Sequence, residues 1–327
     1  IYDIAQKAGA SPSAVSAALN GKGQQRRLKQ ETVERIRRVA EEVGYTTNLQ
    51  ARGLRKAESG LAGMVLPEHE NRFFAELSQK FAQEAHARGL CPAIVHAGRD
   101  PQDQRASVES LIAFSVDRLI VAGATDPSEL ARICRQARVP HVFVDHPCDE
   151  APSVVTDNAS GAAELTGTLL DAMARPREDD PTTWLYFLGG ERQLPASAER
   201  ILGFRQTAQA ANALYDESQL LACGYARDNA EQALAGLYER LGRLPAGLFV
   251  NSIGCFEGVL SFLTRLPESA LSETTFGCYD YDPYAAFLRF PLRMIRQRPD
   301  LMVEEAFHQL DAGTSGAKLI HVAPELV

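Results

Sequence analysis

Two kinds of hydrophobic pattern divide the chain. Over the first 45 residues, apolar side chains recur at the three- and four-residue spacing of amphipathic helices, so each group predicts one buried helix face. The groups are Ile4, Ala5 and Ala8; then Val15, Ala18 and Leu19; and then Val33, Ile36, Val39, Ala40 and Val43, with Thr32 beside the expected cap of the third helix. The pattern predicts three short helices around one small core.

The junction between the first two helices carries clear boundary signals. Gly9 tolerates the positive φ of a helix end, Ser11 can accept a hydrogen bond from a free backbone N–H, and Pro12 suits the first helical position. Two short helices around such a four-residue turn predict a helix-turn-helix, whose second helix fits the major groove of DNA. An ordinary corner between two packed helices is the alternative.

Beyond Gly60 the pattern changes to short, almost continuous apolar runs. Such runs are typical of parallel strands buried on both faces, and helical stretches such as 73–88 and 228–241 would cover the sheets. The runs are 61–66, 117–123, 141–145, 183–189, 246–251 and 274–280. Because 267 residues exceed one comfortable core, we expect an α/β body of two lobes.

Charge is distributed unevenly between these parts. Residues 1–60 hold 11 Lys and Arg against 6 Asp and Glu, a balance of +5, so with −8 for the whole chain the remainder carries −13. A basic segment on an acidic body is expected where one domain meets phosphates. The basic cluster at 24–29 follows a turn signal at 20–23 and could grip a DNA backbone. A solvated charge run is the alternative, but beside the helix pair the cluster favours DNA binding.

Three motifs carry a resemblance to a known family. They are IYDIAQKAG at 1–9, the S-x-x-x-V-S stretch that begins at Ser11 and leads to LN at 19–20, and VGYTTNLQARGL at 43–54. Together they resemble the lactose/galactose-repressor family of bacterial transcription regulators, and the match continues into the body. The run NGKGQQRRLKQETVERI at 20–36 is most similar to the fructose-repressor (catabolite repressor/activator) branch of that family.

The resemblance implies a domain organisation. It places a helix-turn-helix domain at 1–45, a hinge helix or linker at 46–59, and a two-lobed effector-binding and dimerisation domain at 60–327, similar to a periplasmic binding protein with doubly wound lobes. The chain is expected to cross between the lobes more than once, with lobe one at about 60–156 plus 290–320 and lobe two at about 157–289. Because one helix-turn-helix reads only a half-site of double-stranded operator DNA, we expect a homodimer, with a higher oligomer left open.

Twelve residues are expected to contact DNA. They are Tyr2, Ser11, Pro12, Ser13, Ser16, Ala17, Asn20, Lys22, Arg26, Arg27, Asn48 and Leu54. Four of them, Pro12, Ser13, Ser16 and Ala17, are expected on the exposed face of the second helix. All four are small, and none can form the bidentate contact to guanine that arginine makes, so operator reading would rest on the two serines, DNA shape and the hinge.

Leu54 matches the position of the family's minor-groove wedge. An apolar side chain pushed between base steps costs about a few kcal/mol of unstacking but bends the DNA against more protein surface. Gly53 lowers the helicity of this segment by up to about 1 kcal/mol relative to Ala, which favours a hinge helix that forms only on DNA. A packed interdomain leucine is the alternative.

Polar residues at predicted strand ends indicate a ligand site, because open α/β sheets bind ligands beyond the carboxyl ends of their strands. On the family's pattern, Arg200 rather than Arg205 matches the effector-binding arginine. The expected effector-binding residues are Phe73, Phe74, Asp145, His146, Ser197, Arg200, Asn251, Asp280 and Gln297. For each polar residue alone, a cap or solvated loop is the alternative. The two phenylalanines are expected mainly to pack, and only one need line the site.

The residue types suit a sugar phosphate. Carboxylates and amides can bond vicinal hydroxyls, and an arginine can fork onto a phosphate or two hydroxyls. Arg296 and Arg298 are further cations, although strand alternation would point both away from the side of Gln297. With the fructose-repressor-like run, this chemistry predicts an inducer that is a phosphorylated fructose, fructose 1-phosphate above all, and that weakens operator binding.

Several protein classes are disfavoured by missing signals. There is neither a run of 18 apolar residues nor a signal peptide, and the six cysteines form no C-x-x-C pair, so we expect reduced thiols and no zinc site. No GxxxxGK, GxGxxG or HExxH motif predicts a cofactor or metal. We therefore expect a cytoplasmic, non-enzymatic transcription regulator that does not engage a membrane. A regulator answering to another sugar, a sugar-phosphate enzyme and a transport binding protein are the alternatives.

Overall fold

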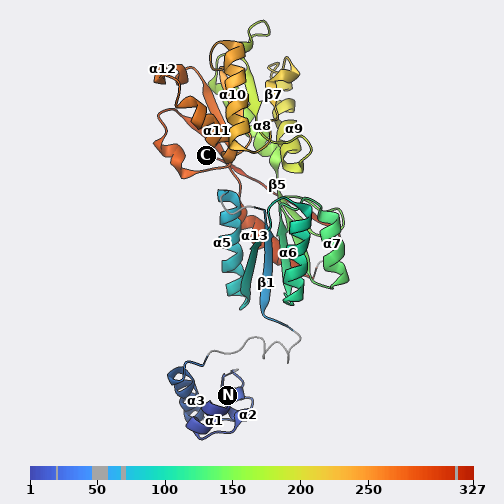
Figure 1. Cartoon of the computed structure of the whole chain (residues 1–327), viewed down its shortest axis with the longest axis vertical. Helices are drawn as coiled ribbons and strands as arrows, with labels where there is room; N and C mark the ends of the chain where they lie inside the picture. The colour runs from blue at the N-terminus through green and yellow to red at the C-terminus, as the bar shows by residue number, and fades with distance from the viewer. Residues whose placement is uncertain (20, 46–57, 68–70, 314–315) are drawn as a thin grey trace. The chain divides into compact units, whose positions relative to one another are not determined.

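The computed structural model describes residues 1–19, 21–45, 58–67, 71–313 and 316–327, which form two compact units, Ile1–Gly60 and Leu61–Val327 (Figure 1). The described residues of the smaller unit form helices and their connections, and the larger unit contains the α/β body. Three residues predicted to contact DNA, Asn20, Asn48 and Leu54, lie outside the described residues, as does most of the expected hinge segment.

Residues 1–45 of the smaller unit, apart from residue 20, contain three helices, α1 (Tyr2–Ala8), α2 (Pro12–Leu19) and α3 (Gln30–Glu42). Gly9 ends α1 with a φ of 57°, in the left-handed region that favours glycine. Ser11 Oγ accepts a hydrogen bond from the Ala14 N–H at 3.2 Å, and Pro12 takes the first position of α2, as predicted. Because α1 ends at Ala8 and α2 begins at Pro12, the turn between the helices has three residues rather than the four expected.

The core of this unit confirms the three predicted helix faces, with two exceptions at the ends of α3. Its fully buried members are Ile4, Ala5, Ala8, Val15, Ala18, Val33, Ile36, Val39 and Ala40. Thr32 lies inside α3 instead of beside its cap, where Lys29 makes no side-chain cap bond. Val43 is 37% exposed because α3 ends at Glu42 and the chain turns at Gly44, with a φ of 62°.

The larger unit contains two six-stranded sheets, with the strand orders β2-β1-β3-β4-β5-β11 and β7-β6-β8-β9-β10-β12. Neighbouring strands run parallel in both, except that β12 pairs antiparallel with β10 at one edge. This order is that of doubly wound sheets, so the predicted fold class is confirmed. The strands are β1 (Leu61–Leu66), β2 (Cys91–His96), β3 (Arg118–Ala122), β4 (His141–Val144), β5 (Ser153–Thr156), β6 (Leu185–Leu188), β7 (Leu220–Leu221), β8 (Gly247–Val250), β9 (Thr275–Tyr279), β10 (Leu292–Arg296), β11 (Leu319–Val322) and β12 (Glu325–Leu326).

Helices cover both faces of each sheet (Figure 1). Around the first sheet they are α5 (Arg72–Ala87), α6 (Pro101–Ala113), α7 (Pro127–Gln136) and α13 (Pro299–Asp311); around the second, α8 (Asn158–Ala172), α9 (Pro195–Ala210), α10 (Arg227–Leu241) and α11 (Ile253–Leu263), with the short α12 (Glu268–Leu271) and the 3-10 turns η1 (Pro181–Thr183), η2 (Glu217–Gln219) and η3 (Pro283–Phe287). We call the first sheet and its helices lobe one, and the second sheet and its helices lobe two.

In lobe one, neighbouring residues of β1 serve two separate cores. Met64 packs in the cluster with α5 and α13, where Phe81 stacks on Phe307 with ring centroids 5.6 Å apart. Val65 packs in the cluster with α6 and α7. Burial on both faces is the physical reason why β1 has no polar residues in its sequence.

In lobe two, the helix pairs on the two faces approach closely at glycines. A Cβ atom on Gly203 of α9 would strike the carbonyl oxygen of Ala159 on α8, and one on Gly258 of α11 would strike the carbonyl oxygen of Arg227 on α10. Only glycine permits this backbone-to-backbone contact. It holds α9 tightly against the sheet face from which it contributes to the site described below.

The chain crosses between the lobes three times. After β5 it enters α8 of lobe two, after β10 it returns to α13 of lobe one, and after β11 it ends in β12 of lobe two. The predicted lobe boundary near residue 290 is therefore wrong for 292–296, which form β10 beside β9 in lobe two. The antiparallel edge strand β12 was not predicted at all.

All six strands predicted from apolar runs are present, and the strands that the pattern did not indicate are mostly short or at edges. β2 lies at the edge of its sheet and is only partly buried, and it contains Pro92, a residue that sheet edges tolerate. β7 and β12 have two residues each. A strand that is very short or only partly buried has no apolar run long enough to distinguish it from a loop in the sequence.

Three further features bear on the predicted protein class. No helix in the described part of the chain is long and apolar enough to cross a membrane. The six cysteines are free, and four of them are buried. Within the described residues, no three His, Cys, Asp or Glu side chains are grouped so that they could hold a metal ion.

Candidate functional site

A cavity of about 230 Å³ lies between the two lobes, beyond the carboxyl ends of their strands. This is where doubly wound sheets bind ligands. Seven of the nine residues predicted to bind an effector line this cavity: Phe73, Phe74, Asp145, His146, Arg200, Asp280 and Gln297. They come from both lobes and were brought together from positions more than 200 residues apart in the sequence.

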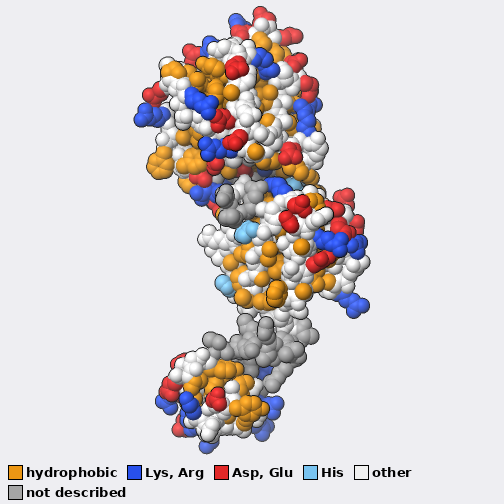
Figure 2. Space-filling model, viewed as in Figure 1, with side chains coloured by type: hydrophobic (Ala, Val, Ile, Leu, Met, Phe, Trp, Pro, Cys, Tyr) orange, Lys and Arg blue, Asp and Glu red, His pale blue; other side chains and the backbone are white. Residues whose placement is uncertain are grey.

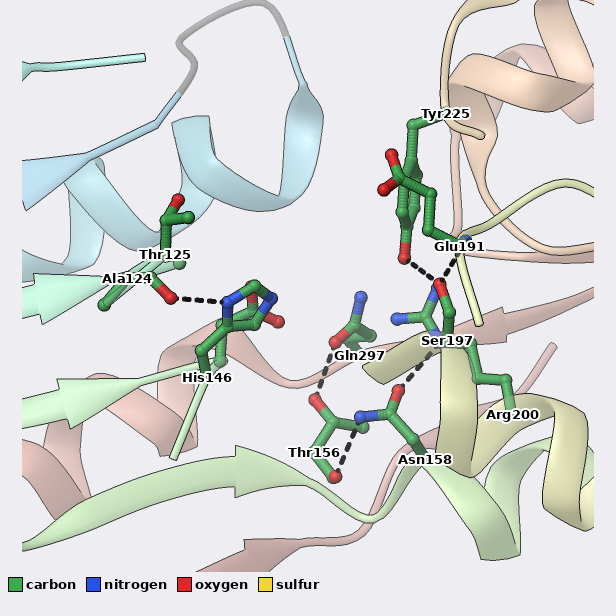
Figure 3. A network of polar contacts seen from close by, with 12 residues as sticks. Ala124, Thr125, His146, Thr156, Asn158, Glu191, Ser197, Arg200, Tyr225 and Gln297 are labelled. Carbon is green, nitrogen blue, oxygen red and sulfur yellow. Dashed lines mark hydrogen bonds and ion pairs between the residues drawn. The ribbon is translucent and has the colours of Figure 1, made fainter. Parts of the chain in front are cut away.

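Arg200 is the buried cation of the cavity. Its side chain projects from α9, is 3% exposed and donates from Nε to Asn158 Oδ1 at 2.8 Å (Figure 3). Its Nη1 donates to the Asn251 carbonyl oxygen at 2.7 Å. The guanidinium also lies over the Tyr279 ring, 3.8 Å from its centroid. Burial opposes the charge, but the carboxylate of Asp280 above all holds the pKa of Arg200 above its usual value.

Asp280, Gln297 and Thr156 form a buried chain of hydrogen bonds between the lobes. Gln297 Nε2 donates to Asp280 Oδ1 at 2.5 Å. Thr156 Oγ1 donates to Gln297 Oε1 at 2.6 Å, as Figure 3 shows. Thr156 ends β5 of lobe one, and Gln297 follows β10 of lobe two, so two of the three crossing segments are joined here. A ligand that contacts these hydrogen-bonded residues therefore contacts segments that connect the two lobes.

Two aspartates at strand ends hold strained backbone conformations. Asp145 follows β4 with a φ of 73°, and Asp280 follows β9 with a φ of 81°. Non-glycine residues rarely adopt this region, and such strain of about 1–3 kcal/mol each gathers at functional sites. His146 lies beside Asp145, with Nε2 3.7 Å from Asp145 Oδ2, while its Nδ1 donates to the Ala124 carbonyl oxygen at 2.8 Å.

An aromatic wall closes the lobe-one side of the cavity. Phe73 and Phe74 begin α5, which Asn71 caps by accepting from the Phe73 N–H at 2.9 Å. The rings meet edge to face at 5.1 Å, and both are more than 90% buried. Both rings belong to the core of lobe one, as expected of residues that mainly pack. Both rings also line the cavity.

Two contacts join the lobes near the cavity. Arg72 Nε of α5 lies 2.6 Å from Asp282 Oδ2, in the segment after β9. Arg99, which follows β2, lies over the ring of Tyr225 in lobe two, 5.6 Å from its centroid. These contacts link the two lobes beside the cavity.

Ser197 was predicted to bind effector but does not line the cavity. Its hydroxyl is fully buried, shares a hydrogen bond with the Tyr225 hydroxyl at 2.7 Å and accepts from the Glu191 N–H at 3.1 Å (Figure 3). Tyr225 itself lines the cavity. Ser197 thus holds Tyr225 in place instead of facing the cavity.

Asn251 is the second predicted residue that does not line the cavity. Its carbonyl oxygen accepts from Arg200, but its side-chain amide is fully buried with no hydrogen-bond partner among the described residues. The amide packs against Gly190, where a Cβ atom would lie 2.7 Å from Asn251 Nδ2. The position after β8 was predicted correctly, but the side chain turns toward the glycine turn after β6.

Eight lining residues were not predicted. They are Asn71, Arg99, Ala196, Tyr225, Ser252, Ile253, Gly254 and Glu257. Five of these lie in or next to α9 and α11, whose first turns follow strands of lobe two, so the strand-end rule could have found them if applied to helix N-termini as well. Arg296 lies over the Tyr281 ring and Arg298 pairs with Asp300, and neither lines the cavity, as strand alternation predicted.

The helical unit exposes Lys and Arg side chains, which Figure 2 shows as separate blue groups at its edge with red ones among them. Tyr2, Ser11, Pro12, Ser13, Lys22, Arg26 and Arg27 are exposed, and Ser16 is half-buried. Ala17 is 8% exposed, so the prediction that it lies on the open face of α2 is wrong. The chain folds back after α2, where the Lys22 N–H donates to the Ala17 carbonyl oxygen at 2.8 Å, and Ala17 is buried beside this turn.

Comparisons with known proteins match both units to one family. Residues 1–48 match the bacterial regulatory proteins of the lacI family, and residues 59–246 match the periplasmic binding proteins and sugar binding domain of the LacI family. The chain belongs to the lacI family. This confirms the resemblance inferred from the three sequence motifs and makes the chain a sugar-responsive, DNA-binding repressor by family.

Individual lacI-family members show the same likeness. The ribitol operon repressor of Klebsiella aerogenes is 41% identical over 193 residues, which are 59% of this chain and 70% of that protein. The Cra transcriptional dual regulator from Pseudomonas putida in complex with fructose 1-phosphate has a TM-score of 0.71 at 20% identity, over 82% of this chain and 98% of that one. The lac repressor dimer bound to operator and the anti-inducer ONPF has a TM-score of 0.80 at 19% identity, over 100% and 96%.

Proposed function

We propose that the chain represses transcription by binding operator DNA through residues 1–60 and that a small polyhydroxylated effector, bound in the interlobe cavity, releases it. The proposal rests on one observation. The cavity lies beside Thr156 and Gln297, whose hydrogen bond joins two of the segments that cross between the lobes. An effector there contacts both lobes at once. Its influence on the operator can be only as large as its differential affinity for the DNA-bound and free states, typically about 1–3 kcal/mol.

The charges of the cavity favour an uncharged effector. Three carboxylates, Asp145, Glu257 and Asp280, face two guanidiniums, Arg99 and Arg200, and no lysine is among the described lining residues. Arg200 already donates two of its five N–H groups to protein oxygens, and the nearby Asp280 carboxylate raises the pKa of Arg200. The similarity to a ribitol operon repressor supports the same class, an uncharged polyol or sugar.

Fructose 1-phosphate, expected from the sequence, is the second candidate. Arg200 retains donors that could fork onto a phosphate, and the similarity to a Cra structure in complex with fructose 1-phosphate favours it. Against it stands the excess of carboxylates around the cavity. The two candidates therefore differ in one measurable property, the charge of the ligand.

Calorimetric titration of the full chain decides between the candidates. Ribitol, sucrose, fructose and fructose 1-phosphate are titrated separately, and each is added to a complex with operator DNA to follow release. We expect an uncharged compound to bind and release operator. Exclusive binding of fructose 1-phosphate would favour the second candidate, and release of operator by none of a broad set of metabolites would contradict the proposed function.

We also propose that the eleven predicted residues other than Ala17 contact operator DNA, with Leu54 as the minor-groove wedge. A homodimer is proposed because one helix-turn-helix covers only a half-site, and the likeness to a lac repressor dimer supports it. We further propose that the protein acts in the cytoplasm, where it would meet operator DNA. Sedimentation with and without a symmetric operator tests the dimer, and two half-sites bound by one chain would contradict it.

A further inference from the structure

We propose that Glu257 determines effector specificity by rejecting phosphorylated sugars. The inference rests on the proposed function, because it assumes that the interlobe cavity is the effector site. It adds a residue outside the predicted set and gives that residue one role, the exclusion of anions from a cavity that accepts their uncharged counterparts.

The position of Glu257 follows from the geometry of α11. This helix begins after Ser252, whose Oγ accepts from the Cys255 N–H at 3.3 Å, and its first turn carries Ile253 into the cavity lining. Glu257 lies four residues later, on the same helix face, and lines the cavity as well. Its side chain is exposed, so it meets the solvent through which a ligand arrives.

The other two carboxylates of the cavity are compensated by neighbouring groups. Asp280 accepts from Gln297 at 2.5 Å and from the Ile253 N–H at 3.4 Å, and Arg200 is its cation. Asp145 is among the carboxylates that favour the charge of Arg200, so the same guanidinium compensates it. Glu257 forms neither a hydrogen bond nor an ion pair with any residue that the structure describes, so its negative charge faces the cavity without a partner.

The two cations of the lining do not cancel this charge. Arg200 is buried and interacts with Asp280, and Arg99 lies on the other lobe, over the ring of Tyr225. A ligand phosphate near Glu257 would bring a charge of about −1.5 to −2 against a carboxylate. A hydroxyl at the same place would instead donate a hydrogen bond to it. One side chain therefore attracts the uncharged ligand and repels the phosphorylated one, which is the repulsive element that specificity requires.

The test compares matched ligands on matched variants. Ribitol with ribitol 5-phosphate, and fructose with fructose 1-phosphate, are titrated into the wild type and into Glu257→Gln, which keeps the shape and hydrogen-bonding capacity of the side chain. Glu239→Gln is the control, because Glu239 is an exposed glutamate of lobe two, on α10, that does not line the cavity. Glu257→Lys extends the series by reversing the charge.

We expect the wild type to bind the uncharged member of a pair more tightly. Glu257→Gln should tighten binding of the phosphorylated member by roughly five- to fiftyfold at low salt, the range for a dianion about 7 Å from a carboxylate at an effective dielectric constant of about 40–80. Binding of the uncharged member should change less than about threefold, and Glu239→Gln should change neither. Glu257→Lys should tighten phosphate binding further, and all gains should shrink as salt is raised.

Three outcomes would overturn the inference. One is a wild type that prefers the phosphorylated member, and another is an equal gain in Glu257→Gln and Glu239→Gln, which would reflect net charge alone. The third is unchanged affinity for the phosphorylated ligand in Glu257→Gln and Glu257→Lys proteins that fold and bind the uncharged ligand. Failure of every member of a broad set of metabolites to release operator from the wild type would contradict the proposed function, and with it this inference.

Discussion

Removing the Arg200 side chain should destabilise the body as well as abolish the effector response. Arg200→Ala leaves Asn158 Oδ1 and the Asn251 carbonyl oxygen without their donor, and it deprives Asp280 of a buried counter-charge. Charge-assisted hydrogen bonds contribute about 1.5–3 kcal/mol each, and breaking one partner out of a buried charge pair costs about 3–5 kcal/mol. We therefore expect a loss of about 3–5 kcal/mol in the free energy of unfolding of the body.

The measurement is thermal unfolding by calorimetry, combined with operator and effector binding. For a domain of this size, 1 kcal/mol shifts Tm by about 2–4 °C, so the body should melt roughly 6–20 °C lower. The control is Arg205→Ala on the same helix, where the partly exposed Arg205 pairs with Glu217 at the surface. Such a pair is worth about 0–1 kcal/mol, so this variant should melt within about 4 °C of the wild type.

Operator binding separates the two effects of Arg200→Ala. The helical unit forms its own core, so below the melting temperature operator affinity should be retained while effector no longer releases the DNA. Arg200→Lys keeps the charge but cannot donate in a planar fork, and it should lose most of the response with a smaller shift in Tm. An unchanged Tm in Arg200→Ala would refute the structural role, and loss of operator binding in a folded protein would refute the separation of the two units.

Three further predictions concern the cavity, the helix packing and the hinge. Ser197→Ala and Tyr225→Phe each remove the same 2.7 Å hydrogen bond, so each should weaken effector binding, and the double variant should be no weaker than the worse single one; additive losses in this double-mutant cycle would contradict the coupling. Gly203→Ala should lower the free energy of unfolding by about 1–3 kcal/mol because the new methyl group meets a backbone oxygen, whereas Gly236→Ala, in open space on a helix, should raise it by about 0.5–1 kcal/mol; denaturant titration that finds equal effects would disprove the packing argument. Leu54→Ala should weaken specific operator binding and DNA bending much more than non-specific binding, and unchanged bending by FRET would rule out the wedge.

Much of the fold could be predicted because it depends on local pattern. The apolar run of β1 and the amphipathic spacing of α3 describe how each element is buried, and burial is what the residue types encode. Edge strands escaped prediction because they are buried on one side only or are very short. The assignment of β10 to lobe two escaped for another reason, since a strand does not carry in its own residues the identity of the neighbour with which it pairs.

The candidate site, too, could be predicted only in part from the sequence. Residues that directly follow a buried strand, such as Asp145 and Asp280, could be placed at the cavity from the strand-end rule. Ser197 and Asn251 satisfied the same rule, yet their side chains turn toward Tyr225 and Gly190. That choice depends on contacts with segments far away in the sequence.

The sequence by itself determined the family, the three predicted helices with their net positive charge, the two-lobed α/β body and the strand ends where a ligand site would form. It could do so because helix caps, hydrophobic periodicity and charge balance are local properties of the sequence. Only the tertiary structure decided which of those strand-end groups face the cavity, that Ala17 is buried, and that Glu257 carries a charge there with which no described residue pairs. The physical reason is that compensation of a charge or a hydrogen bond is a property of pairs. The partners come together only when three crossings of the chain bring the two lobes around one cavity.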